Sequence, residues 1–296
     1  MPAIQTRETL LSLRNILVPS DFSPISEAAL RLACNIARRY DSKVHIAHVI
    51  VPEIYSPGPI EGMPLPLEEP RRRVQAELER MRNSACLRDV RHHQIVRYGA
   101  IWDQIQAVLR EEKVDMIVAG THGAGGLQKV LLGSIAEEIF RKAECPVITV
   151  GPQVTAENLD IGFTHVLFAT DLSPQSLHAA PYAFSLAQEY HARLTMLTVI
   201  EDLKDSSPQG RILARMSHEN DLKRRLPRPA DFLRALSYEV LFGAAPEVIV
   251  QAAASLGANL IVLGVRKAEG LASHLPWTTA SQVVRSSKCP VLTVRQ

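Results

Sequence analysis

The sequence of this chain contains the same pattern twice, and this repeat constrains the fold more than any other feature. Residues 16–24 read ILVPSDFSP, and residues 166–174 read VLFATDLSP. The copies also end alike, with CPVITV at 145–150 and CPVLTV at 289–294. A chain of 296 residues is long enough for two domains of ordinary size. We therefore predict tandem domains at 1–151 and 162–296, joined by a linker at 152–161.

Each copy alternates short apolar runs with stretches of helical periodicity. Strands that are apolar on both faces suit a parallel sheet covered by helices. The pattern predicts an α/β fold in which each copy is a five-stranded, doubly wound parallel sheet of flavodoxin-like order. In the first copy we expect strands at 15–19, 43–50, 94–98, 115–119 and 147–150, and helices at 26–40, 72–87, 101–112 and 134–142.

Composition excludes several classes of partner. The 33 Lys and Arg residues nearly balance the 31 Asp and Glu residues, so we expect no nucleic acid partner. We find no apolar run long enough to cross a membrane and no secretory leader, and the four cysteines form no CxxC pair, which favours the cytoplasm. His92 and His93 are adjacent and should face opposite sides of a strand, so we expect no metal site.

The candidate ligand site lies where two loops should meet. In an open parallel sheet, ligands bind beyond the carboxyl ends of the strands, where the winding reverses. The loop after the fourth strand contains glycines, which let a backbone approach a ligand, and it ends at a helix start that favours an anion. These glycines could also be simple turn residues. The four residues of this spacing are Gly120, Gly123, Gly133 and Ser134.

Together these features resemble the universal stress protein (UspA-like) family over nearly the whole chain. The resemblance rests on the PSDFS start at 19–23, the Gly-x2-Gly-x9-Gly-Ser loop of the family's ATP-binding branch, and the closing CPVITV strand. It implies two adenine-nucleotide α-hydrolase-like domains that pair through their closing strands as an internal pseudo-dimer. It also implies ATP as the ligand, with Mg²⁺ held mainly by the phosphates.

The resemblance also implies which residues bind the nucleotide. Asp21 has a second explanation, because its carboxylate could cap the first turn of the following helix. Val49 could equally be an ordinary core residue. By resemblance, the ribose and adenine would contact Pro19, Ser20, Asp21 and Val49, and the phosphates would contact Gly120, Thr121, Gly123, Gly133, Ser134 and Ile135.

The second copy departs from this motif. Gly264 is kept, but Lys267 and Trp277 stand where the next two glycines should be, and Thr278 replaces the serine. Arg266 and Lys267 could attract an anion by their charge, but the glycine backbone that would hold the phosphates is missing. We therefore expect nucleotide in the first domain only, and a second domain kept for architecture or regulation.

The sequence thus favours a tandem universal stress protein that binds ATP and acts as a stress-response regulator or sensor. We expect an unidentified protein partner and a homodimer formed by the same strand pairing. We find no spaced set of acid, base or nucleophile, so we expect no catalytic residues and at most slow ATP hydrolysis. Two alternatives stay open: an interaction or dimerisation module that binds no nucleotide, and an adenine-nucleotide hydrolase-like enzyme.

Overall fold

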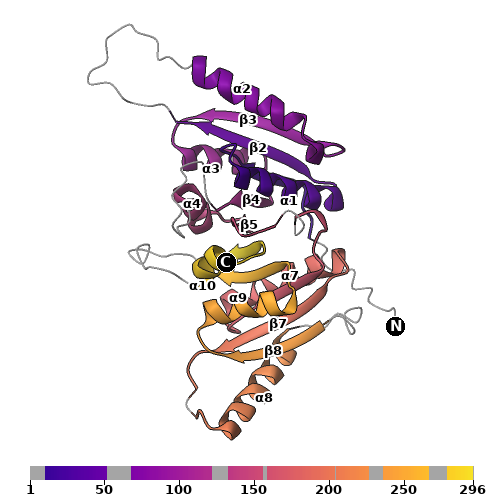
Figure 1. Cartoon of the computed structure of the whole chain (residues 1–296), viewed down its shortest axis with the longest axis vertical. Helices are drawn as coiled ribbons and strands as arrows, with labels where there is room; N and C mark the ends of the chain where they lie inside the picture. Colours follow the sequence, from indigo (N-terminus) through magenta and orange to yellow (C-terminus); the bar gives the residue numbers. More distant parts are fainter. Residues whose placement is uncertain are drawn as a thin grey trace, which may run out of the picture.

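The computed structural model describes residues 11–51, 68–121, 133–155, 159–203, 205–226, 236–266 and 279–295. Its centre is one sheet of ten strands in the order β3-β2-β1-β4-β5-β10-β9-β6-β7-β8. The sheet follows the long axis of the molecule, with the first copy in indigo and magenta and the second in orange and yellow (Figure 1). The two copies therefore share one sheet, and helices cover it.

Each copy follows the predicted alternation of strands and helices. In the first copy the described elements are β1 (Asn15–Pro19), α1 (Pro24–Tyr40), β2 (Lys43–Ile50), α2 (Glu68–Arg82), the 3-10 helix η1 (Ala85–Leu87), β3 (His92–Tyr98), α3 (Ile101–Glu111), β4 (Met116–Gly120), α4 (Ser134–Lys142) and β5 (Val147–Val150). In the second copy they are β6 (His165–Ala169), α6 (Pro174–Leu177), α7 (Ala180–Glu189), β7 (Arg193–Ile200), α8 (Pro208–Arg225), β8 (Leu236–Phe242), α9 (Ala245–Leu256), β9 (Leu260–Val265), α10 (Thr279–Ser286) and β10 (Val291–Arg295).

The doubly wound parallel sheet of each copy is confirmed, but its strand order differs from the prediction. β1 pairs with β2 on one side and with β4 on the other, all in parallel. A flavodoxin-like order would place the third strand beside the first. Here the chain winds outward through β2 and β3 before it returns to β4. The central strands β1, β4 and β5 are apolar on both faces, whereas β3 reads HHQIVRY and only Ile95 in it is buried, as suits an edge strand. The polar residues of β3 are therefore the sequence signal for the observed order.

The helices divide between the two faces of the sheet. Helices α1, α2, α7 and α8 pack on one face, in a core that spans both copies. Helices α3 and α4 cover the other face of the first copy, and α9 and α10 cover that of the second. The loops after β1 and β4 therefore leave toward opposite faces, which opens a crevice between the ends of these neighbouring strands.

The two copies join through β5 and β10, which pair antiparallel with Ile148 opposite Leu292. The pairing is reciprocal, because Thr149 Oγ1 donates to the Val291 carbonyl at 3.2 Å and Thr293 Oγ1 donates to the Val147 carbonyl at 3.3 Å. This arrangement confirms the internal pseudo-dimer. It also uses the free edges of both strands. A homodimer cannot repeat this pairing, so the expectation that it forms through the same strands is wrong, while the homodimer itself stays a prediction. The outer strands β3 and β8 are the edges that remain.

One predicted helix of the first copy is shorter than expected, and one helix of the second copy divides where its counterpart α1 is continuous. The helix expected at 72–87 ends at Arg82: the Ser84 N–H donates to the Met81 carbonyl, only three residues back, and a separate 3-10 turn follows. In the second copy, the counterpart of α1 divides into α6 and α7. Pro181 lies in the first turn of α7 and has no N–H to continue the α6 hydrogen-bond ladder.

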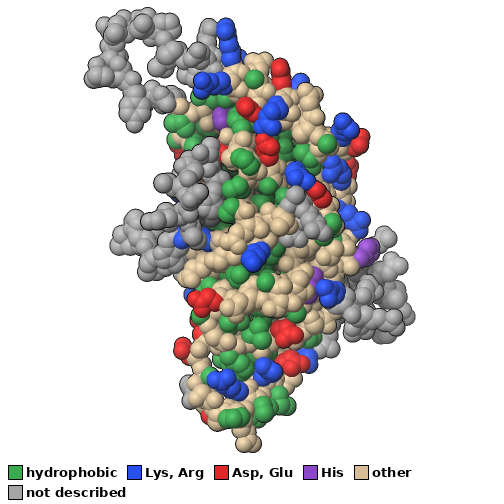
Figure 2. Space-filling model, in the orientation of Figure 1, with side chains coloured by type: hydrophobic (Ala, Val, Ile, Leu, Met, Phe, Trp, Pro, Cys, Tyr) green, Lys and Arg blue, Asp and Glu red, His purple; other side chains and the backbone are tan. Residues whose placement is uncertain are grey.

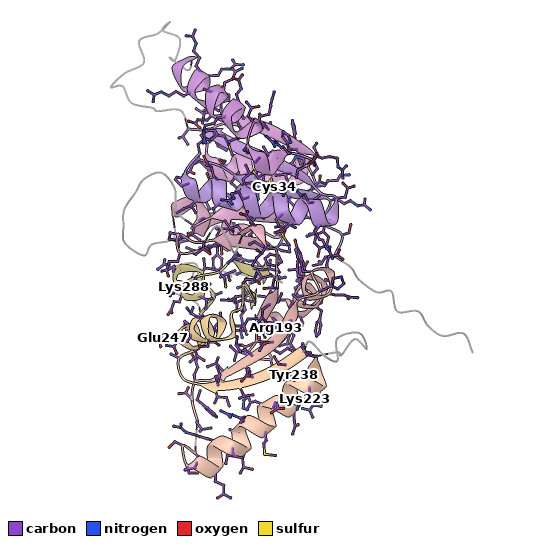
Figure 3. The ribbon with its side chains drawn as sticks, turned by 45° about the vertical axis from the view of Figure 1, so that its right-hand side comes forward. Cys34, Arg193, Lys223, Tyr238, Glu247 and Lys288 are labelled. Carbon is purple, nitrogen blue, oxygen red and sulfur yellow. The ribbon has the colours of Figure 1, made fainter. Side chains whose placement is uncertain are left out.

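Charges of both signs are interspersed over the surface. On the face shown in Figure 2, Lys and Arg side chains lie among Asp and Glu side chains rather than in one basic stripe. On α8, Lys223 bonds to Glu219 and also lies over the Tyr238 ring of β8 at 5.5 Å (Figure 3). No helix in the described ranges is long and apolar enough to cross a membrane.

The β5–β10 junction generates the first prediction. Replacing Ile148 with Ala removes a fully buried side chain at the centre of the junction and should lower the free energy of unfolding by about 2–5 kcal/mol. Ile161 is 56% exposed, so Ile161→Ala should change it by less than about 0.5 kcal/mol. Urea unfolding of the whole chain measures both. If both variants lower the free energy of unfolding by the same small amount, the junction does not stabilise the two copies as expected.

Candidate functional site

The first part of the site is the loop that joins β1 to α1. The Ser20 N–H donates to the Ala47 carbonyl of β2 at 2.9 Å, and His48 Nδ1 donates to the Ser20 carbonyl at 2.8 Å. Phe22 has a left-handed backbone with a φ of 62°. Its ring stacks on the His48 ring, with 4.5 Å between the centroids. These contacts hold the loop against the carboxyl end of β2.

The aspartate of this loop has the same structural role in both copies. The Ser23 N–H donates to Asp21 Oδ1 at 3.0 Å, and the Ser173 N–H donates to Asp171 Oδ1 at 2.9 Å. Partial burial alone would raise the pKa of Asp171, but hydrogen bonds from Ser173 and Ser176 outweigh it and lower this pKa below its ordinary value. A local turn therefore explains why both copies carry an aspartate.

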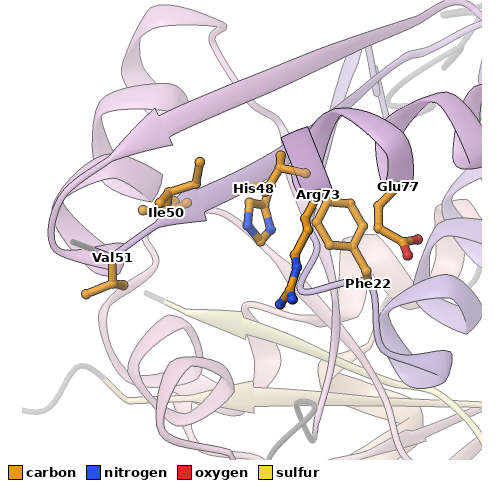
Figure 4. A pocket seen from close by; sticks show the side chains of 8 residues that line it. Phe22, His48, Ile50, Val51, Arg73 and Glu77 are labelled. Carbon is orange, nitrogen blue, oxygen red and sulfur yellow. The ribbon is translucent and has the colours of Figure 1, made fainter. Parts of the chain in front are cut away.

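A pocket of about 420 Å³ opens beside this loop, between the end of β2 and α2. Figure 4 shows the side chains of Phe22, His48 and Arg73 close together at the pocket, with Glu77 on the next turn of α2. The pocket thus combines aromatic surface, apolar surface and one charged group of each sign, as small-molecule sites do. Its remaining lining residues are Val49, Ile50, Val51 and Val74.

The structure brings the predicted base-contacting residues to this edge of the sheet. Pro19 is the last residue of β1, and Val49 stands one residue before the end of β2. The Val49 side chain is partly buried against the core under α3. Val49 is therefore an ordinary core residue that also lines the pocket.

The second part of the site is the loop between β4 and α4. The Gly133 N–H donates to the Thr121 carbonyl at 2.7 Å, which joins the two ends of this loop. Gly133 is the N-cap of α4. The N–H groups at 134–136 have no carbonyl within the helix to accept them. With the positive end of the helix dipole, they make this terminus suitable for an anion.

Gly120 has a packing role that the motif alone did not reveal. A Cβ at Gly120 would lie 2.7 Å from Ile25 Cγ2, and one at Gly264 would lie 2.4 Å from the Gln175 carbonyl oxygen. In both copies the glycine lets the first turn of a helix approach the neighbouring strand. This explains why Gly264 persists in a copy whose other motif residues have changed. The glycine at 120 therefore does not distinguish a ligand site from a packing contact.

Several predicted residues fall outside the described part of the chain. These are Gly123 in the first copy and Lys267, Trp277 and Thr278 in the second, together with the side chain of Ser134. The predictions for them stay predictions.

Sequence reasoning missed three residues that shape the pocket, namely Phe22, His48 and Arg73. The internal repeat held a signal for two of them. Phe22 corresponds to Leu172 and His48 to Thr198, so the copies differ where the first carries aromatic rings. Arg73 lies in a region where the copies differ in length, and only the fold places it beside the loop.

The fold defines a tandem α/β protein with a pocket at the carboxyl ends of the first two strands. The profile of the universal stress protein family matches residues 12–151 and 162–295. The chain therefore belongs to the universal stress protein family, with two family domains in tandem, as the sequence resemblance predicted.

Individual relatives agree with this assignment. A universal stress protein of Mycolicibacterium smegmatis is 28% identical over 300 residues, which cover 95% of this chain and 96% of the relative. One from Methanocaldococcus jannaschii is 33% identical over 138 residues, 46% of this chain and 81% of the relative. The crystal structure of a universal stress protein from Archaeoglobus fulgidus superposes with a TM-score of 0.72 at 19% identity, covering 96% and 99% of the two chains.

The paired glycines generate the second prediction. Gly120→Ala should cost about 1–3 kcal/mol of unfolding free energy, because the Ile25 side chain can partly yield. Gly264→Ala should cost more, since backbone atoms of Gln175 and Ser176 block its Cβ at 2.4–2.7 Å. Gly151→Ala is the control, with its nearest atoms at 3.8 Å. Thermal and urea unfolding measure the series. A harmless Gly264→Ala would refute the packing explanation.

Proposed function

We propose that this chain binds ATP in its first domain and acts as an ATP-responsive regulator or sensor in stress physiology. The observations that carry the proposal are the pocket at the ends of β1 and β2 and the helix terminus at Gly133, both at the carboxyl edge of the first domain's sheet. One subsite is apolar and aromatic, and the other favours an anion. A base joined to phosphates has matching chemistry. Membership of the universal stress protein family supports the same ligand.

The pocket suits the adenine and ribose. The stacked rings of Phe22 and His48 offer apolar aromatic surface to a base. His48 Nδ1 donates to the Ser20 carbonyl, so the neutral ring carries its lone pair on Nε2. That nitrogen can accept from an exocyclic amino group, which adenine has. Asp21 would accept from a ribose hydroxyl while keeping its bond from Ser23.

The phosphates would lie at the start of α4. Backbone N–H groups of Ser134 and Ile135 are the donors there, whereas the Gly133 N–H is already used by Thr121. Arg73 at the pocket supplies a positive charge that a phosphate could meet. Mg²⁺ would be held mainly by phosphate oxygens, since Mg²⁺ keeps several waters and needs few protein ligands.

The second copy differs at the same place in ways that oppose a second site. Leu172 and Thr198 replace the stacked rings of Phe22 and His48, and Thr198 is buried. Arg225 of α8 donates to the Leu172 carbonyl at 3.3 Å, which brings that helix over the loop after β6. We therefore propose one nucleotide per chain.

We further propose that ATP serves as a ligand rather than as a substrate turned over rapidly. Fast phosphoryl transfer needs a positioned nucleophile and strong cationic stabilisation of the leaving charge. Among the described residues of the crevice, Asp21 caps a turn and His48 is held by Ser20, and both have structural duties. A protein partner that senses the bound state would complete the regulatory role. The nucleotide-free interaction module and the hydrolase-like enzyme are the alternatives to be tested.

The third prediction separates nucleotide binding by Asp21 from its part in the local turn, since Ser23 is the N-cap of α1. Asp21→Asn keeps an oxygen to accept from Ser23 but removes the charge, so ATP affinity should fall about tenfold while stability changes little. Asp171→Asn is the matched control and should leave ATP affinity unchanged. Calorimetry on the whole chain should give about one site. If neither the unchanged chain nor the variants bind ATP, the result would support the nucleotide-free interaction module. Two ATP sites per chain would refute the single-site proposal.

The fourth prediction concerns the consequence of binding. ATP should slow hydrogen exchange of the amides at 134–136, because the phosphates would accept from them. Phosphate release from the same samples should be slow or absent. Rapid steady-state turnover that is lost on changing one acidic or histidine residue would make the protein an enzyme. Unchanged exchange at these amides, with ATP bound, would move the phosphates elsewhere.

A further inference from the structure

We propose that the first domain binds a divalent transition metal ion such as Zn²⁺ through His45, His93 and Glu112. This cluster lies at the amino-terminal edge of the sheet, opposite to the edge that holds the nucleotide pocket. His45 is near the start of β2, His93 is near the start of β3, and Glu112 is the C-cap of α3. One ligand atom from each side chain lies within 4.8 Å of the others.

The fold, rather than sequence spacing, assembles these groups. Adjacent His92 and His93 do not act together, since the His92 ring bonds back to the Val90 carbonyl. His93 instead stands in register with His45 on the neighbouring strand. The end of α3 then returns Glu112 to the same edge. A search for histidines close in sequence could not find this set.

His45 is oriented as a metal ligand would be. Its side chain is fully buried, and its Nε2 bonds to Asn15 Oδ1 at 3.0 Å. The Asn15 amide donates to the Lys113 carbonyl, so its oxygen faces the ring and the proton of His45 belongs on Nε2. Nδ1 therefore holds the lone pair, and it has no hydrogen-bond partner in the described part of the chain. A carbonyl that fixes the opposite nitrogen is the usual support of a metal-binding histidine.

Each histidine lies about as far from one oxygen of Glu112 as two ligands of a tetrahedral ion lie from each other. His45 Nδ1 lies 3.4 Å from one Glu112 carboxylate oxygen, and His93 Nδ1 lies 3.6 Å from the other. Zinc bonds of about 2.0–2.1 Å at tetrahedral angles place two ligand atoms about 3.4 Å apart. A lone pair facing a carboxylate at this distance is unfavourable unless a cation or a proton lies between them. Imidazole and carboxylate ligands suit Zn²⁺.

A metal ion can reach the cluster from solvent on the side of His93 and Glu112. The His93 side chain is 50% exposed and that of Glu112 is 26% exposed, so both can adjust by the small shift that closes the ligand set. Three protein ligands leave one tetrahedral position for water. A bound ion would tie the edge strand β3 to β2 and to the end of α3.

The second copy provides an internal comparison. At the equivalent positions, His165, Thr195, Ser237 and Leu256 replace Asn15, His45, His93 and Glu112. There His165 Nε2 and Thr195 Oγ1 are 2.8 Å apart, Thr195 and Ser237 hydroxyls are 2.8 Å apart, and His165 Nδ1 donates to the Leu256 carbonyl. That network leaves no ring nitrogen unpartnered. The metal-ligating groups are therefore specific to the first copy.

The test is metal binding by the untagged, nucleotide-free chain. Calorimetry with Zn²⁺ should show one site per chain, and Co²⁺ should give the visible spectrum of a tetrahedral nitrogen and oxygen site. His93→Ser, which copies the second domain, and Glu112→Gln should each weaken binding at least about tenfold. His92→Ser is the matched control and should bind as the unchanged chain does.

Three outcomes would overturn the proposal. The first is a chain that binds neither ion, which would leave the cluster as a histidine–carboxylate contact only. The second is equal loss in His92→Ser. The third is a Co²⁺ spectrum dominated by sulfur charge transfer, which would place the ion on cysteine. Circular dichroism of each variant checks that the substitution leaves the fold intact.

Discussion

The antiparallel pairing of β5 with β10 is the contact on which the rest of the structure depends. Each copy ends in an apolar strand, and an apolar strand left at the edge of a sheet would expose unpaired backbone groups. Pairing β5 with β10 gives the backbone groups of both edges hydrogen-bond partners, and it joins the two halves of the main core. Because the strands run in opposite directions, the carboxyl edges of the two copies point to opposite sides. The two crevices are therefore separated by the body of the sheet and are free to diverge.

Divergence between the copies separates what the fold requires from what a ligand would require. The turn built on Asp21 recurs at Asp171, and the glycine at 120 recurs at 264, each with a structural cause in both places. The aromatic pair of Phe22 and His48 does not recur. Features kept in both copies hold the helices on the sheet. Features confined to one copy give the first domain its own chemistry.

Strand β2 connects the two candidate sites of the first domain. His45 near its start belongs to the amino-terminal cluster, and His48 near its end lines the pocket. Three residues of strand separate them by roughly 10 Å. Both histidines have one ring nitrogen fixed, by Asn15 in one case and by the Ser20 carbonyl in the other. The same strand thus presents a lone pair at each edge of the sheet.

The sequence by itself determined the repeat, the class of fold, the positions of most strands and helices, and the family. Hydrophobic periodicity and local capping carry that information, because they depend on residues near one another in the chain. It also identified the loops after β1 and β4, since the carboxyl edge of a parallel sheet collects them.

Only the tertiary structure decided which strands are neighbours and which side chains meet. The return of the chain from β3 to β4 is marked in the sequence only by the polar residues of β3, which suit an edge strand, and the predicted order did not take them into account. Arg73 reaches the pocket from α2, and His45, His93 and Glu112 meet across two strands and a helix end. Such groups are distant in sequence, and the long-range packing that assembles them is a property of the whole fold.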